Sequence, residues 1–120
     1  MIKMEIDQAS LNRTIRELGQ LGNNMSKEAS GIVEATAYKI SSKAKNEHTF
    51  KNRTGRLQSS IHVSKLSGIG QEIGTNVDYA GYVHDGTSKT KGDPFLQRPF
   101  YQEVPKMKNK LKRLLNKSWQ

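Results

Sequence analysis

The residues that most often carry out chemistry are scattered along this chain of 120 residues. Its three histidines, His48, His62 and His84, are isolated from one another, and no HxxxH motif or carboxylate pair is spaced to hold a metal ion. Asp78 and Asp85 lie seven residues apart around a predicted short helix, where helix capping or ion pairing is expected instead of acid–base catalysis. The histidines are therefore expected at the surface or facing a partner.

The remaining residue types that could act in catalysis or bind a cofactor form no recognisable motif. There is no cysteine, which excludes thiolate metal sites, disulfides and cysteine nucleophiles. No serine sits in a nucleophile elbow with an acid following in triad order. Gly68-Ile69-Gly70 lacks the third glycine of a dinucleotide-binding loop, and a hairpin turn accounts for it. The sequence predicts a protein without metal or cofactor that is not an enzyme and that works by assembling with other proteins.

The positive charge of the chain is concentrated at its C-terminus. The net charge is +9, and residues 101–120 carry six Lys or Arg residues against one acidic residue. The six basic residues would line the flanks and back of a helix: Lys106, Lys108, Lys110, Lys112, Arg113 and Lys117. Such a helix can face solvent, an acidic protein surface or nucleic acid, since binding to phosphates needs only this kind of charge.

The first half of the chain is predicted to form one strand and two helices. Alternation of apolar and polar residues indicates a short half-buried strand over Met1–Ile6. A first helix is expected from Asp7 or Ser10 to about residue 21. A second, longer helix is expected over about 24–47, because its apolar residues recur at i, i+3, i+4 and i+7.

The second half is predicted to begin with a β-hairpin. Leu57–Ser64 alternates like a strand, Ser67–Gly70 marks a turn, and Gln71–Val77 is expected to return beside the first strand. A short helix over Tyr79–Asp85 should end at Gly86 in a left-handed conformation. Together with the flanking helices, these elements predict an α+β fold in one domain, 1–120, with N-terminal helices and a C-terminal helix packed on a small antiparallel sheet.

The chain after this short helix divides into a loop and a final helix. Thr87–Asp93 has no apolar residue, so an exposed and mobile loop is expected. From Phe100 onward, apolar residues follow a near-heptad spacing that predicts a helix. Pro105 should kink this helix or begin a new one, because proline lacks a backbone N–H. No apolar run reaches the roughly 20 residues of a membrane span, so no membrane contact is expected.

Three phrases in the middle of the chain match a known pattern in order and spacing. They are Thr54–Ile61 (TGRLQSSI), Gly74–Val83 (GTNVDYAGYV), and Gly86-Thr87 leading to Pro94–Phe100 (PFLQRPF). With the flanking helices, they resemble the minor tail-component and tail-completion family of siphophages, the long-tailed bacteriophages. The family commonly has an acidic and then an aromatic residue before the Gly-Thr, where this chain has His84-Asp85.

The resemblance implies a structural protein of the phage neck. Members form a ring, usually a homohexamer, that joins the DNA-filled head to the tail. The implied partners are other copies of the chain, a head-closure or connector protein, and a tail terminator or tail-tube protein, while DNA passes through the lumen without sequence recognition. The protein would be made in the host cytoplasm and reside in the virion. The alternatives are a tail terminator that caps the tube, and a nucleic-acid-binding protein that uses the basic C-terminal helix.

Several residues are predicted to contact partners. Arg56 can form an intersubunit contact or an intrachain pair with Asp78 or Asp85. Tyrosines of the short helix keep a polar group for an interface, and the loop is expected to order against a neighbouring ring. The full predicted set is Arg56, Tyr79, Tyr82, Thr87, Ser88, Lys89, Thr90, Lys91, Lys110 and Arg113.

Overall fold

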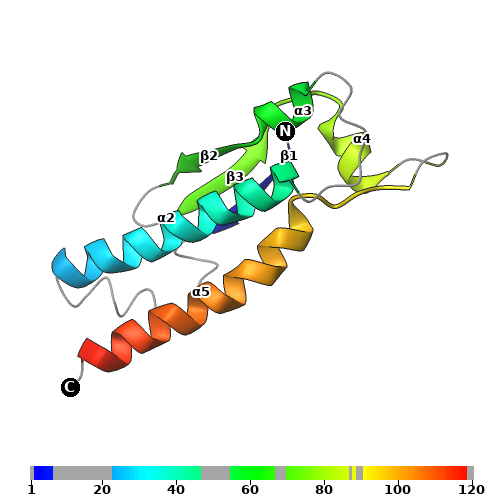
Figure 1. Ribbon diagram of the computed structural model, residues 1–120. Helices are drawn as coiled ribbons and strands as arrows, with labels where there is room; N and C mark the ends of the chain where they lie inside the picture. Colours follow the sequence, from blue (N-terminus) through cyan, green and yellow to red (C-terminus); the bar gives the residue numbers. More distant parts are fainter. Residues whose placement is uncertain are drawn as a thin grey trace.

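The structure, a computed structural model, describes residues 2–6, 23–46, 55–66, 70–86, 88 and 91–118. In these residues the elements are β1 (Ile2–Ile6), α2 (Asn23–Asn46), α3 (Arg56–Ser60), β2 (His62–Lys65), β3 (Gln71–Thr75), α4 (Ala80–Asp85) and α5 (Gln97–Ser118). They form an α+β fold, as predicted (Figure 1). The helix predicted over about 10–21 lies outside the described residues, as does His48.

The sheet is antiparallel, with β3 between β1 and β2. Ile2 pairs with Thr75 and Ile6 with Gln71, while Val63 of β2 pairs with Ile73. The predicted N-terminal strand is confirmed, and so is the antiparallel pairing of the two predicted hairpin strands over His62–Lys65 and Gln71–Thr75. β1 approaches β3 closely at Gly74, where a Cβ atom would lie 2.6 Å from the carbonyl oxygen of Ile2. Glycine therefore sets the spacing of the two strands at this point.

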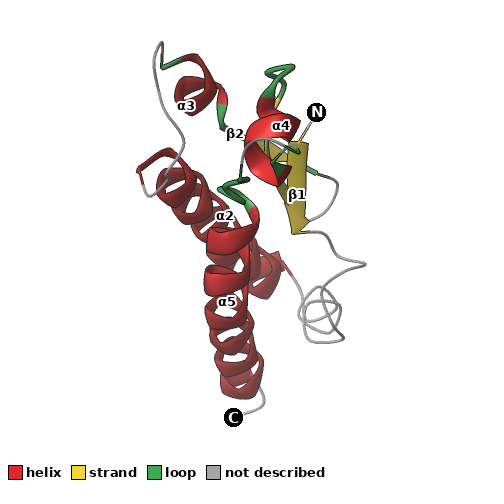
Figure 2. Ribbon diagram, turned by 90° about the vertical axis from the view of Figure 1, so that its right-hand side faces the viewer, coloured by secondary structure: helices red, strands yellow, loops and turns green. Residues whose placement is uncertain are grey.

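The two long helices lie side by side, and α2 also covers the sheet (Figures 1 and 2). Both present the apolar stripes that the sequence predicts. The buried residues of these stripes are Ala29, Val33, Ala37, Ile40 and Ala44 on α2, and Val104, Met107, Leu111 and Leu114 on α5. They form one core with Ile6, Ile73 and Phe95, which joins the sheet to both helices. The fold is elongated, with principal extents of 55 × 22 × 20 Å.

Pro105 lies inside α5, and no new helix begins there. Proline removes the hydrogen bond that its N–H would donate to the carbonyl of Tyr101. The helix nevertheless continues, because Val104 and Met107 on either side of Pro105 are both buried in the core. Figure 1 shows that α5 curves along its length.

The strand predicted from Leu57 is wrong in its first half. Residues 56–60 form the short helix α3, and the strand begins only at His62. Gly55 turns the chain into α3 with φ 73° and ψ 0°, a conformation that suits glycine. The hydroxyl of Ser60 donates to the carbonyl of Leu57 at 2.7 Å. Leu57 and Ile61 are both buried, as predicted, because a spacing of four also fits one face of a helix.

Candidate functional site

The three sequence phrases meet at one end of the molecule. This end comprises α3, α4 and the start of α5, which lie together beyond the sheet in both ribbon views (Figures 1 and 2). The hydroxyls of Ser60 and Thr75 are hydrogen-bonded at 2.5 Å, which joins the first phrase to the second. The second and third phrases meet where the main-chain N–H of Asp93 donates to the carbonyl of Val83 at 2.9 Å.

We call residues 87–91, between α4 and α5, the arm. The residues that flank it on either side, Gly86 and Gly92, are in backbone contact, and we call this contact the closed base of the arm. Gly86 has φ 85° and ψ 178°, so it has the expected positive φ but is not in the left-handed helical conformation. A Cβ atom on Gly92 would lie 2.6 Å from the carbonyl carbon of Asp85 and 2.7 Å from the nitrogen of Gly86. The two ends of the arm therefore touch, and glycine is needed for that contact.

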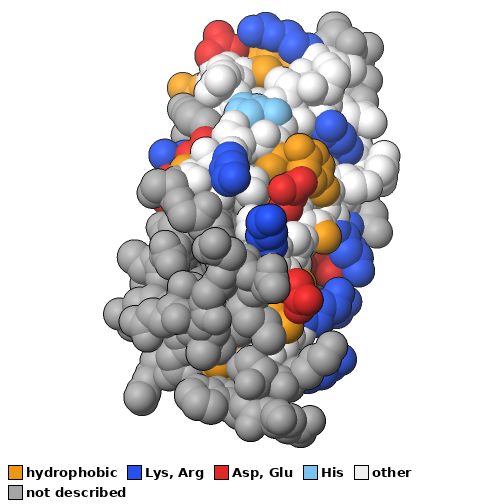
Figure 3. All heavy atoms as spheres, turned by 90° about the vertical axis from the view of Figure 1, so that its left-hand side faces the viewer, with side chains coloured by type: hydrophobic (Ala, Val, Ile, Leu, Met, Phe, Trp, Pro, Cys, Tyr) orange, Lys and Arg blue, Asp and Glu red, His pale blue; other side chains and the backbone are white. Residues whose placement is uncertain are grey.

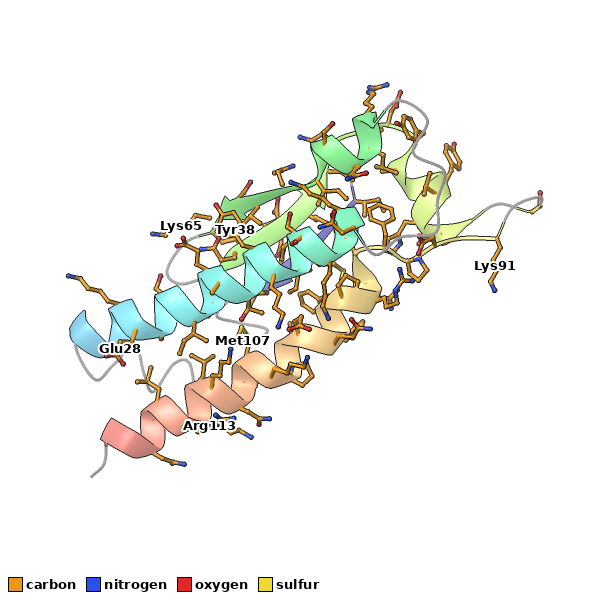
Figure 4. The ribbon with its side chains drawn as sticks, in the orientation of Figure 1. Glu28, Tyr38, Lys65, Lys91, Met107 and Arg113 are labelled. Atoms are coloured by element: carbon orange, nitrogen blue, oxygen red, sulfur yellow. The ribbon has the colours of Figure 1, made fainter. Side chains whose placement is uncertain are left out.

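Asp93 fixes the base of the arm to α5. It was predicted to be exposed with the rest of the loop, but it is buried, with only 5% of its side chain accessible. Its carboxylate accepts a hydrogen bond from Nη1 of Arg98 at 3.0 Å. The carboxylate can be buried because this charge-assisted bond compensates for lost hydration. Of the arm itself, the structure describes Ser88 and Lys91, and both are exposed; Lys91 lies apart from the long helices (Figure 4).

His84 lies beneath the base of the arm and is buried, in contrast to its predicted place at the surface. Its ring meets Phe95 edge-on, with the centroids 5.2 Å apart. Nδ1 lies 2.9 Å from a carboxylate oxygen of the exposed Asp85. The burial follows from α4, because Ala80 and His84 are four residues apart and share the helix face that packs inward.

Of the other predicted residues at this end, Arg56 and Tyr82 are exposed and Tyr79 is half-buried. The guanidinium carbon of Arg56 is 5.6 Å from the ring centroid of Tyr79, a cation–π contact that the sequence did not indicate. The carboxylate of Asp85, one of the predicted partners of Arg56, is bonded to His84. Tyr82 is 69% exposed. Thr87, Lys89 and Thr90 lie outside the described residues, and the binding role of the whole set stays a prediction.

Replacing Asp93 by asparagine should loosen the base of the arm. We expect a loss of about 1–3 kcal/mol in the free energy of unfolding, because Arg98 loses a charged acceptor in a buried position. Urea unfolding followed by circular dichroism measures this loss. Asp85→Asn is the matched control: its carboxylate is 71% exposed, so a change below about 0.5 kcal/mol is expected there. Equal effects of the two substitutions would show that the Asp93–Arg98 pair does not hold the base.

The other two predicted residues lie on α5. Lys110 and Arg113 are both exposed there. Two helical turns before Lys110, the buried carboxylate of Glu103 is surrounded by the amino groups of Lys43 at 2.8 Å, Lys39 at 3.2 Å and Lys106 at 3.3 Å. The hydrogen bond from Lys43 is the main cause that lowers the pKa of Glu103 to about 2. The cluster ties α5 to α2 and carries a net positive charge.

The two buried carboxylates in the described residues hold parts of the fold together. Asp93 and Glu103 are held in ion pairs. In the described part of the chain, no group of three or more His, Cys, Asp or Glu residues is placed to hold a metal ion. None of the described helices is both long and apolar enough to span a membrane.

These features define a small α+β protein whose buried carboxylates fix its two long helices and the base of a loop. A family model described as "Bacteriophage HK97-gp10, putative tail-component" matches residues 11–86, which is more than half of the chain. The chain therefore belongs to this HK97-gp10-like family of phage tail components. The match ends at Gly86, where the arm begins. A search of curated proteins and a search of solved structures gave no significant match.

Proposed function

We propose that this chain is the tail-completion protein that joins the DNA-filled head of a siphophage to its tail. In this proposal several copies form a ring around a lumen for DNA, between a head-closure ring and the tail terminator or tail tube. Membership of a family of phage tail components supports a place in the virion. The order of the three phrases in the sequence supports the neck as the location within it.

The feature that best supports the proposal is the arm with its closed base. Arg98 and the backbone around Gly92 fix both ends of the arm to the fold. The two described arm residues, Ser88 and Lys91, are exposed. A polar segment with anchored ends suits docking, because fewer residues have to be ordered when a partner binds. We therefore assign the contact with a neighbouring ring to the arm, with Tyr82 beside it.

The test is a phage in which residues 87–91 are replaced by a Gly-Ser segment of equal length. Gly86, Gly92 and Asp93 stay, so the variant protein should unfold at the same urea concentration as the wild type. We expect few or no infectious particles, and electron micrographs should show filled heads and tails of normal length that remain separate. The control is the double substitution Lys27→Gln and Lys65→Gln, which removes two lysines, as the arm replacement does, but from exposed positions far from the arm.

Three outcomes of this experiment would reject the assignment. Normal numbers of infectious particles from the arm variant would show that the arm does not join head to tail. Tails of abnormal length would indicate that the protein caps the growing tube, as a tail terminator does. A defect of equal size in the lysine control would point to lost charge and not to the arm.

A further inference from the structure

In the part of α5 whose burial the structure describes, no exposed side chain is acidic. Its single acidic residue, Glu103, is buried, with 3% of its side chain accessible. Lys106, Lys110 and Arg113 are exposed and follow one another at i, i+4 and i+7, which places them on one row along the helix. Exposed amide side chains border this row at Gln102, Asn109 and Asn116.

The basic row of α5 is continued by α2. Lys110 lines a hollow of about 380 Å³ together with Glu28, Gly31, Ile32 and Ala35 of α2, so this flank of α5 faces that helix. Lys39 of α2 and Lys106 of α5 meet at opposite oxygens of the Glu103 carboxylate, at 3.2 and 3.3 Å. Both lysines remain more than half exposed, at 57% and 63%. Glu103 thus holds two lysines from different helices side by side at the surface.

We propose that Lys39, Lys106, Lys110 and Arg113 form a surface that follows the phosphates of duplex DNA. We call it the α2–α5 basic surface. A lysine amino group keeps three donors, so one that bonds to Glu103 can still donate to a phosphate oxygen. Arg113 adds a guanidinium group that can bind phosphate through two donors. The surface would not distinguish one base sequence from another, because its charged groups contact only the phosphates of the DNA backbone.

An acidic protein is the other kind of partner that this charge would fit, and the composition of the surface favours DNA. Lysine is depleted at protein–protein interfaces, which are instead enriched in aromatic residues, Met and Arg. Protein–DNA interfaces are more polar and strongly positive. Three of the four charged residues here are lysines.

The inference rests on the proposed function for the source of the DNA, which would be the phage genome passing through the ring. Figure 4 shows Arg113 on the opposite side of the molecule from Lys65, so the two can be altered separately. In the space-filling view, Lys and Arg side chains recur along the right-hand edge (Figure 3). The chain thus offers basic residues both on and away from the proposed surface.

The experiment measures binding of the full chain to a fluorescent duplex of about 25 base pairs, by anisotropy, from about 50 to 200 mM salt. The test variant is Lys110→Gln with Arg113→Gln. The control is Lys65→Gln with Lys91→Gln, which removes the same charge from exposed positions away from the α2–α5 basic surface. Circular dichroism melting confirms that both variants are folded. We expect the test variant to bind at least about tenfold more weakly at the lowest salt. A plot of the logarithm of its binding constant against the logarithm of the salt concentration should have a slope shallower by about 1.8, because two phosphate contacts are lost.

The control should stay much closer to the wild type in both affinity and slope. Absence of binding by the wild type at about 50 mM salt would overturn the inference. So would equal losses in the two variants, because net charge alone would then explain the binding. Poly-glutamate serves as the protein-like probe: if it binds more tightly than DNA and loses more in the test variant, the surface belongs to an acidic protein instead. Binding to DNA and joining of heads to tails are measured separately, so either proposal can fail alone.

Discussion

Replacing Glu103 by glutamine should lower the free energy of unfolding by about 2–3 kcal/mol, below the usual effect for a fully buried ion pair because two of its three lysines are more than half exposed. The carboxylate lies between amino groups of Lys43, Lys39 and Lys106. A neutral amide would leave these three cations close together without their anion, and α2 and α5 would lose their main polar link. Urea unfolding of the variant measures the loss. Glu28→Gln, at an exposed position on α2, should change the stability by less than about 0.5 kcal/mol.

The same carboxylate should make the protein sensitive to acid. The pKa of Glu103 is about 2 in the folded protein, against an ordinary value of 4.5. Its stabilising contribution is therefore complete above pH 4.5 and is lost as the pH falls toward 2. We expect this loss to be about 2 kcal/mol, less than the full shift implies, because two of the lysines are exposed to solvent.

The difference in unfolding free energy between the wild type and Glu103→Gln, measured from pH 6 to about pH 2, isolates this contribution from other carboxylates. The difference should shrink as the pH falls. A difference that stays constant over this range would mean that Glu103 has an ordinary pKa and that the lysine cluster is not formed in solution.

Replacing Gly74 by alanine should cost about 1–3 kcal/mol, the usual penalty for an added methyl group in a space that cannot accept it. The new Cβ would lie 2.6 Å from the carbonyl oxygen of Ile2 and 3.2 Å from the Cα of Lys3. Both are backbone atoms of β1, so the strand itself has to move. The hydrogen bonds between β1 and β3 should weaken, and amide hydrogen exchange should become faster in β1 than in β2.

Substitution of Gly31 by alanine provides a control for which the opposite change in the free energy of unfolding is expected. It lies on the exposed face of α2, and a Cβ atom there would meet nothing within 4 Å. Gly31→Ala should therefore stabilise the protein by about 0.5–1 kcal/mol, because alanine favours the helix more than glycine does. Urea unfolding of both variants gives the comparison. Stabilisation by Gly74→Ala would mean that β1 does not approach β3 as closely as the structure has it.

The two long helices could be predicted from the sequence because their apolar residues repeat over several turns. The short helix α3 could not. Leu57 and Ile61 are four residues apart, which fits one face of a helix as well as one face of a strand. The structure resolves the ambiguity through Gly55, which redirects the chain, and through the back-bonding hydroxyl of Ser60. Neither effect produces a repeating pattern of apolar residues that could be recognised in so short a segment.

The candidate site was predicted only in part, because its contacts join residues that are distant in the sequence. Arg56 and Tyr79 come from different phrases, and Lys43 is 60 residues from Glu103. One signal was available for Glu103, since it is the single acidic residue among the basic residues of 101–120. A lone acid in such a segment is a candidate for burial among them. No comparable signal marked the burial of His84 or Asp93.

The closed base of the arm also makes this segment a suitable insertion point for foreign sequence. Gly92 touches the backbone of Asp85 and Gly86, so the two ends of the arm stay together whatever length of chain connects them. Lengthening a flexible loop is inexpensive in free energy, at about 0.6 kcal/mol for each doubling of its length. An affinity tag or a fluorescent-dye site placed between residues 87 and 91 should thus leave the core intact, provided that Gly86, Gly92 and Asp93 are kept.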